Sequence, residues 1–187
     1  IVGANQSGAI LTGTVTFSNA SSSVRVRGVE FNNTVTHSGG GSVYLDSVTF
    51  AASVAINKSG TGSLLISNTF ADTAVLTASG TAGSIGISNS TFGTTTQSAG
   101  STVFTDMTSM RAVTITGGTT RIVNSTIFAS SSTTNGITSS AGTTVILRNA
   151  YVFGLLAGIA RLSLAGNYTI NNVIFDRPNS TLGTNTN

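Results

Sequence analysis

Short runs of alternating apolar and polar residues recur along the whole chain, and most of them follow a Gly or Ser. In the segments 24–26 and 43–45 the first and third residues are Val or Leu, whereas the middle residues are Arg and Tyr. Alternation with a period of two is typical of β-strands that bury one face. Val, Ile, Thr and Phe dominate these runs, and they favour strands over helices. The pattern therefore predicts a succession of short β-strands.

The runs are copies of one repeat. They read SSSVRVRGVEF (21–31), GGSVYLDSVTF (40–50), GTGSLLISNTF (60–70), AGSIGISNSTF (82–92), AGSTVFTDMTSM (99–110), GGTTRIVNSTIF (117–128), AGTTVILRNAYVF (141–153) and NYTINNVIF (167–175). The copies end at Phe31, Phe50, Phe70, Phe92, Met110, Phe128, Phe153 and Phe175. Most copies are followed by a polar step and a second brief apolar run, as at 34–36, 54–56, 74–76 and 113–115.

One copy of roughly 20 residues cannot bury its own apolar face, but a chain that coils once per copy stacks each apolar position on its counterpart. We therefore predict an all-β fold, a parallel β-solenoid of about eight coils with roughly 20 residues per coil. The prediction treats 1–187 as a single domain, with an N-terminal strand or coil at 1–20, repeats at 21–175 and a polar tail at 176–187. A β-sandwich predicts irregular strand spacing, and a trimeric fibre of short repeats does not explain the 20-residue period.

Polar residues that follow the first strand of each copy form a second column. They read Arg27, Asp46, Ser67, Ser88, Asp106 and Asn124, with Asn68 and Asn89 next along. Asn adopts the left-handed conformation more readily than most residues, and its side chain can bond along a stack. We expect this column to mark a corner of the coil.

The repeat G-x-x-V-x-[IL]-x-[ND]-x-x-F, which covers roughly residues 21–175, resembles the right-handed parallel β-helix, or pectin-lyase-like, superfamily. The resemblance implies a right-handed coil. It says little about function, because that superfamily includes polysaccharide lyases and hydrolases, phage tailspikes, adhesins and other surface proteins.

Charged residues make up only 7% of the chain, against about 25% in a typical soluble domain. The net charge of +3 comes from few titratable groups, and Arg25 and Arg27 are the closest basic pair, so nothing predicts nucleic-acid binding. The chain has no Cys, and no apolar run approaches the roughly 20 residues of a membrane span. We expect an extracellular protein, or one on a cell or virion surface.

The acidic residues do not predict a catalytic site. They are Glu30, Asp46, Asp72, Asp106 and Asp176. Asp46 and Asp106 fall three coils apart in one column, which corresponds to about 14 Å, beyond the roughly 5–9.5 Å that separates paired glycosidase carboxylates. The single His37 lies in a Gly-rich turn and is expected at the surface. Without Cys or a second His, nothing predicts a metal site or a cofactor, and we expect no enzymatic activity.

Eight Asn-x-Ser/Thr sequons are candidate N-glycosylation sites. They are Asn5, Asn19, Asn32, Asn57, Asn89, Asn124, Asn167 and Asn179.

The middle residue of each first strand should point outward, and these residues are Arg25, Tyr44, Leu65, Gly86 and Phe104. Such a column is more apolar than a freely solvated face. Arg25, Tyr44, Leu65 and Phe104 are therefore candidates for a subunit interface or for stacking on a sugar.

Two hypotheses for function follow. The first is a structural subunit of an extracellular filament, appendage or surface adhesin that assembles with copies of itself. Residues 1–20 read as further strand and not as a cap, so we expect either a longer protein or ends covered by another copy. The alternative is a trimeric virion tailspike or tail-fibre domain that binds a cell-surface glycan. A polysaccharide lyase or hydrolase is disfavoured by the carboxylate spacing. Thr-x-Thr pairs do not recur on successive coils, which argues against an ice-binding face.

Overall fold

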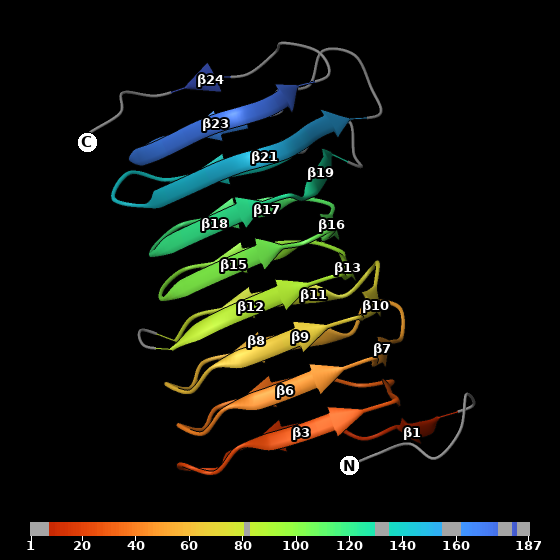
Figure 1. The fold of residues 1–187 in the computed structure, drawn as a ribbon. Helices are drawn as coiled ribbons and strands as arrows, with labels where there is room; N and C mark the ends of the chain where they lie inside the picture. The colour runs from red at the N-terminus through yellow and green to blue at the C-terminus, as the bar shows by residue number, and fades with distance from the viewer. Residues whose placement is uncertain (1–7, 81–82, 130–134, 155–161, 176–180, 183–187) are drawn as a thin grey trace.

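The computed structural model describes residues 8–80, 83–129, 135–154, 162–175 and 181–182. Within them the chain forms a parallel β-solenoid of about seven turns with roughly 21 residues per turn and no helix (Figure 1). The predicted fold class is therefore confirmed, with about seven turns against the eight repeat copies recognised in the sequence.

Each turn contributes a strand to three faces, which we call the front, side and back faces (Figure 1). The front face contains β3 (Val24–Arg27), β6 (Val43–Asp46), β9 (Leu64–Ser67), β12 (Ser84–Ser88), β15 (Ser101–Thr105), β18 (Thr119–Val123), and the first parts of β21 (Thr144–Gly154) and β23 (Asn167–Phe175). The side face contains β1 (Ala9–Leu11), β4 (Val29–Phe31), β7 (Thr49–Phe50), β10 (Phe70–Ala71), β13 (Thr91–Phe92), β16 (Ser109–Met110), β19 (Thr126–Ala129), and the second parts of β21 and β23. The back face contains β2 (Val15–Phe17), β5 (Val35–His37), β8 (Ala55–Lys58), β11 (Val75–Ala78), β14 (Thr95–Gln97), β17 (Val113–Ile115), β20 (Ile137–Ser139), β22 (Leu162–Leu164) and β24 (Thr181–Leu182).

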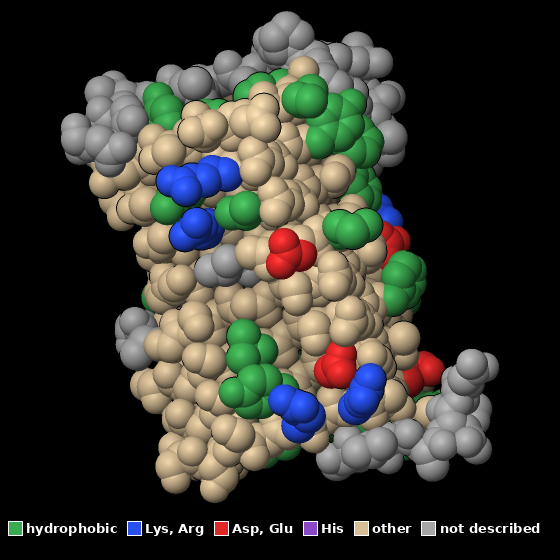
Figure 2. Space-filling view, in the orientation of Figure 1, with side chains coloured by type: hydrophobic (Ala, Val, Ile, Leu, Met, Phe, Trp, Pro, Cys, Tyr) green, Lys and Arg blue, Asp and Glu red, His purple; other side chains and the backbone are tan. Residues whose placement is uncertain are grey.

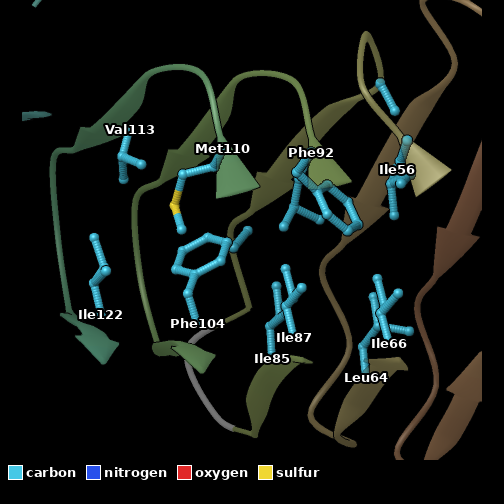
Figure 3. Packing of buried hydrophobic residues seen from close by; sticks show 14 of the residues in the cluster. Ile56, Leu64, Ile66, Ile85, Ile87, Phe92, Phe104, Met110, Val113 and Ile122 are labelled. Carbon is cyan, nitrogen blue, oxygen red and sulfur yellow. The ribbon is translucent and has the colours of Figure 1, made fainter. Parts of the chain in front are cut away.

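The interior is filled by columns of apolar side chains that stack from one turn to the next. On the front face the inward column reads Val26, Leu45, Ile66, Ile87, Phe104, Ile122, Leu147 and Ile170. Figure 3 shows part of this interior, with side chains from the front face meeting those from the side and back faces. Burial of these columns supplies the main driving force for coiling, because a single turn has no apolar partner of its own.

The corner between the front and side faces is a column of residues in the left-handed conformation. It comprises Gly28, Ser47, Asn68, Asn89, Asp106, Asn124, Asn149 and Asn172, all with φ between 45° and 62°. The expected asparagine corner is confirmed, but its register is shifted: Arg27, Asp46, Ser67 and Ser88 belong to the preceding, outward-facing strand position. Asn suits this corner because its short polar side chain tolerates a positive φ.

The Phe residues that end the repeats do not form one column. Phe31 stacks on Phe50, with ring centroids 5.3 Å apart, and Phe92 continues the same inward position. Phe70, however, is 61% exposed, and Ala71 fills the core beside it. The corner explains the shift, because the inward residue stands three positions after the corner residue in most turns, whereas Phe70 stands only two after Asn68.

Phe128 and Phe153 are shifted the other way. They stand four positions after Asn124 and Asn149, so Ile127 and Val152 take the buried places. The two rings stack on each other outside the core, with centroids 5.8 Å apart.

The prediction that Phe104 points outward is wrong. Its side chain is completely buried, and Figure 3 shows its ring directed into the interior toward Met110. Phe104 pairs with Ile87 and Ile122 in the inward column, whereas the position in line with Gly86 is Val103. A slip of one residue moves a side chain to the opposite face of a strand.

The corner between the back and front faces carries a glycine ladder. A Cβ on Gly60 would lie 2.2 Å from the carbonyl oxygen of Gly39, and one on Gly80 would lie 2.6 Å from that of Gly60. Gly100 and Gly118 repeat the relationship at 2.5 and 2.2 Å. Successive turns therefore approach too closely at these four glycines for a side chain.

The predicted polar tail is only partly described. Thr181–Leu182 forms β24, which pairs with β22 and extends the back face.

Candidate functional site

The outward side chains of β3, β6 and β9 surround a shallow depression with a volume of about 280 Å³, which we call the front groove. Its lining residues are Arg25, Tyr44, Asp46, Leu65, Ser67 and Asn68. Figure 2 shows hydrophobic and charged side chains gathered on the lower part of this face, where Figure 1 places these strands. The parallel register brings them together, because it aligns Arg25 with Tyr44 and Tyr44 with Leu65.

An aromatic and aliphatic platform forms the floor of the front groove. The guanidinium carbon of Arg25 lies 5.4 Å from the centroid of the Tyr44 ring, a cation–π contact that orients both side chains. Leu65 leans over Gly86, since a Cβ on that glycine would lie 2.8 Å from Leu65 Cδ2. The absence of a side chain at Gly86 therefore makes room for Leu65 on the surface.

Asp46 is held at one edge of this platform by four polar neighbours. Its Oδ1 accepts hydrogen bonds from Asn68 Nδ2 at 2.8 Å, Ser67 Oγ at 3.2 Å and Ser47 Oγ at 3.3 Å. Its Oδ2 lies 3.2 Å from Arg27 Nε. The hydrogen bond from Asn68, followed by that from Ser67 and the charge of Arg27, lowers the pKa of Asp46. The groove thus presents a fixed, ionised acceptor beside an apolar surface.

Of the four predicted interface or sugar-stacking residues, the structure brings three together. Arg25, Tyr44 and Leu65 line the front groove, whereas Phe104 lies in the core. Asp46 lies on the same face of β6 as Tyr44, two residues later, whereas Ser67 and Asn68 belong to the next turn, and only the register of the stack places them beside Tyr44.

The described carboxylates are not gathered at one place. Asp46 is the last residue of β6, whereas Asp106 follows β15, three strands further along the front face, so the two occupy different positions in their turns. Asp72 binds Arg111 instead, with Oδ2 2.6 Å from Nη2. Asp176 lies outside the described residues. Among the described residues, no group of three or more His, Cys, Asp or Glu side chains is placed to hold a metal ion.

The expectation that His37 is a surface residue is wrong. It is 99% buried in the solenoid interior, where Nε2 lies 2.8 Å from the carbonyl oxygen of Gly41. Lys58 occupies the same position one turn later and donates to the carbonyl of Gly60. Gln97, two turns beyond, donates to the carbonyl of Gly100 at 3.0 Å. These side chains therefore form hydrogen bonds with carbonyl groups of the glycine-rich corner. Their role is structural, because buried polar groups need hydrogen-bond partners.

The sequons differ in accessibility. Asn32, Asn89 and Asn124 are exposed, while Asn19, Asn57 and Asn167 are half-buried; Asn5 and Asn179 lie outside the described residues. The amide nitrogen of Asn19 donates to the carbonyl of Ser22, which ties this side chain to the chain itself. Asn32 and Asn89 are therefore the better-placed acceptors for a glycan.

A second depression was missed by sequence reasoning. It lies beside the asparagine corner at the opposite end of the stack and has a volume of about 360 Å³; we call it the side groove. Its lining residues are Asn124, Ser125, Thr126, Asn149, Ala150, Tyr151, Asn172 and Ile174. The spacing of Asn124, Asn149 and Asn172 was a signal in the sequence, but the alignment of repeats on their Phe residues concealed it.

Comparison with protein-family models, with curated proteins and with solved structures gave no match for this chain. No helix in the described part of the chain is long and apolar enough to cross a membrane.

Proposed function

We propose that this chain is a structural β-solenoid of an extracellular filament, appendage or adhesin on a cell or virion surface, and that it associates with copies of itself. The observation that carries the proposal is the presence of exposed apolar side chains on the side face. In the outward column of that face, Ile10 is 53% and Phe70 61% exposed, and Glu30 and Thr49 stand between them. Exposed aromatic and aliphatic side chains on a rigid strand face are typical of surfaces that meet another protein.

The construction of the stack supports a mechanical role. Parallel pairing continues through nine strands of the back face, and the corners are fixed by the left-handed column and the glycine ladder. Nearest-neighbour contacts of this kind produce an extended, stiff body. Ser, Thr and Asn provide most of the surface polarity, which leaves few charges to keep copies apart.

Light scattering after size-exclusion chromatography, together with negative-stain imaging at micromolar concentration, tests the self-association. We expect oligomers or filaments for the native chain and a shift to monomer for Phe70→Ser. Leu65→Ser on the front face is the matched control and should leave the assembly unchanged. A compact monomer of the native chain at these concentrations overturns the proposal.

Glycan binding at the front groove is the second candidate. It is favoured by one observation, the platform of Tyr44 and Leu65 beside the fixed carboxylate of Asp46. Apolar sugar faces stack on aromatic rings, while sugar hydroxyls donate to carboxylates. A glycan array followed by titration of Tyr44→Ala and Tyr44→Phe tests this: the first variant should lose binding and the second retain it. An array without hits contradicts this candidate.

We propose no catalytic role and no cofactor. Asp46 and Asp72, two acids on neighbouring turns, are engaged in separate ion pairs with Arg27 and Arg111, which supports this view. Release of reducing sugars from acidic polysaccharides by the purified chain overturns it.

We also propose a right-handed coil and a relationship to the pectin-lyase-like superfamily. The path from β3 through β4 and β5 to β6 is a crossover between parallel strands of one sheet, and such crossovers are right-handed in about 98% of cases. An experimental structure with a left-handed coil contradicts both parts.

A further inference from the structure

The side groove lies where the asparagine corner meets the second halves of β21 and β23. In Figure 2 hydrophobic side chains gather at the upper right, over the region that β19, β21 and β23 occupy in Figure 1. The register aligns Thr126 with Tyr151 and Tyr151 with Ile174, so three successive turns each contribute one outward side chain to the groove.

Three exposed asparagines form one wall of the groove. Asn149 Nδ2 donates to Asn124 Oδ1 at 3.1 Å, and Asn172 Nδ2 donates to Asn149 Oδ1 at 2.9 Å. A carboxamide has two N–H donors and an oxygen with two lone pairs. These two hydrogen bonds use only one N–H each of Asn149 and Asn172. Each of the three side-chain amides therefore keeps hydrogen-bonding groups for a ligand.

The aromatic side chain of the groove is fixed in place. Tyr151 is 39% exposed, and its ring stacks on Phe153 with centroids 5.1 Å apart. Phe153 in turn stacks on Phe128, whose ring lies 5.3 Å from the guanidinium carbon of Arg111. A ring supported in this way loses little conformational entropy when a ligand lies against it. Ile174, 64% exposed, extends the apolar surface by one turn.

The chemistry of the lining selects the ligand class. None of the eight lining residues is charged, so a phosphate, carboxylate or ammonium ligand finds no ionic partner among them. Amides and the hydroxyl of Thr126 match the donors and acceptors of sugar hydroxyl groups, and the Tyr151 ring matches the apolar face of a sugar ring. The amides repeat at the strand spacing of about 4.8 Å along the axis, which suits an extended chain that presents hydroxyl groups at regular intervals.

We propose that the side groove binds an uncharged, linear polysaccharide, which lies along the solenoid axis against Tyr151 and hydrogen-bonds to Asn124, Asn149 and Asn172. The side groove contains none of the residues of the front groove. Thr126, Tyr151 and Ile174 continue the outward column of the side face, but Phe70, the residue used to test self-association, lies three turns before Thr126 and outside the groove. The inference therefore goes beyond the proposed function, and it stands or falls separately.

The test uses the full chain and a panel of neutral oligosaccharides of glucose, mannose, xylose and galactose, with oligogalacturonate as the charged control. Calorimetric titration should detect binding of at least one neutral oligosaccharide to the native chain. The substitution Tyr151→Ala should weaken that binding about tenfold. Tyr151→Phe keeps the ring and should bind as the native chain does. Asn149→Gly keeps the left-handed backbone but removes the amide, and it should weaken binding severalfold. Arg121→Gln, an exposed substitution outside both grooves, should have no effect.

A measurement on the native chain makes the test independent of any variant's folding. The side-chain amide NMR signals of Asn149 and Asn172 should shift during titration with the neutral oligosaccharide that binds. Failure of the whole neutral panel to bind at millimolar concentration overturns the proposal. It is also overturned if binding is lost with Tyr44→Ala and kept with Tyr151→Ala, a result that supports the front groove instead. Tighter binding of oligogalacturonate contradicts the assigned ligand class.

Discussion

His37 and Lys58 lie opposite each other on the neighbouring strands β5 and β8, and both basic side chains are almost completely buried. The strands on either side place Phe17 and Ala78 at the same register position. Loss of contact with water lowers the pKa of His37 and of Lys58, and the nearby ammonium of Lys58 lowers the pKa of His37 further. The interior therefore favours the neutral form of both groups.

Stability should consequently fall as the solution becomes more acidic. A base whose folded pKa is below its ordinary value takes up its proton more readily in the unfolded chain, so acid favours unfolding. For His37 the loss begins below its ordinary value of 6.5, and for Lys58 below 10.5. Within each window one such group changes the free energy of unfolding by up to about 1.4 kcal/mol per pH unit. Urea denaturation at a series of pH values measures this slope.

Two substitutions separate the contributions of these groups. Lys58→Met keeps a long side chain without a charge and should flatten the slope below pH 10.5. His37→Gln keeps a hydrogen-bonding group toward Gly41 and should flatten the slope just below pH 6.5. Arg121→Gln, an exposed substitution, is the control. An unchanged slope in both core variants shows that neither group drives the acid sensitivity.

Phe104 and Phe70 test the register of the strands, because the first side chain is buried and the second is exposed. Phe104→Ala opens a cavity in the core and should lower the free energy of unfolding by about 3–5 kcal/mol. Phe70→Ala removes the same atoms from an exposed position and should cost less than about 1 kcal/mol. Chemical denaturation of both variants gives the comparison. Equal losses would mean that the strand β10 or β15 is shifted by one residue.

The glycine ladder should be intolerant of even one methyl group. Gly60→Ala places a Cβ 2.2 Å from the carbonyl oxygen of Gly39 and should destabilise the fold by about 1–3 kcal/mol. Gly13→Ala is the control, because nothing lies within 4 Å of the added Cβ. That variant should differ from the native chain by no more than about 0.5 kcal/mol, or gain slightly. Thermal unfolding of the two variants measures these changes in stability. A Gly60→Ala variant as stable as the native chain contradicts the close approach of the turns.

Asn68 should set the acidity of Asp46. Asn68→Gly preserves the left-handed backbone but removes the hydrogen bond to Oδ1, so the pKa of Asp46 should rise toward its ordinary value of 3.8. In the native chain the lowered pKa contributes stability that is present above the ordinary value and is lost as the pH falls through the folded pKa. NMR titration of the Asp46 carboxyl group measures the change. Asn89→Gly, at the same corner one turn later, should leave that pKa where it is.

The comparison of repeats with turns shows how much could be predicted. Alternation at 24–26 and 43–45 placed strands correctly, because a strand that buries one face must alternate. The recurrence every 20 or so residues predicted the solenoid, because a repeat too small to fold alone must stack. Arg25, Tyr44 and Leu65 were correctly placed on one surface for the same reason.

The register was harder, since Phe is an unreliable marker of the inward position. Phe70, Phe104 and Phe128 each stand one residue away from the place assigned by aligning the repeats on their aromatic ends. Counting from Asn68 or Asn124 gives the observed register instead. A residue with a positive φ fixes the position of the corner, and the corner determines which residues of the two adjoining strands point inward.

By itself, the sequence determined that this protein is a stack of short parallel strands, because period-two alternation inside a repeat of this length has few other ways to bury its apolar residues. Only the tertiary structure decided which side chains meet. Asp46 and Asn68, or Tyr151 and Ile174, are about one turn apart in the chain, and they become neighbours through hydrogen bonds between turns. Burial of His37 and Lys58 was likewise decided by packing: the corner carbonyls needed donors, and the interior supplied the space.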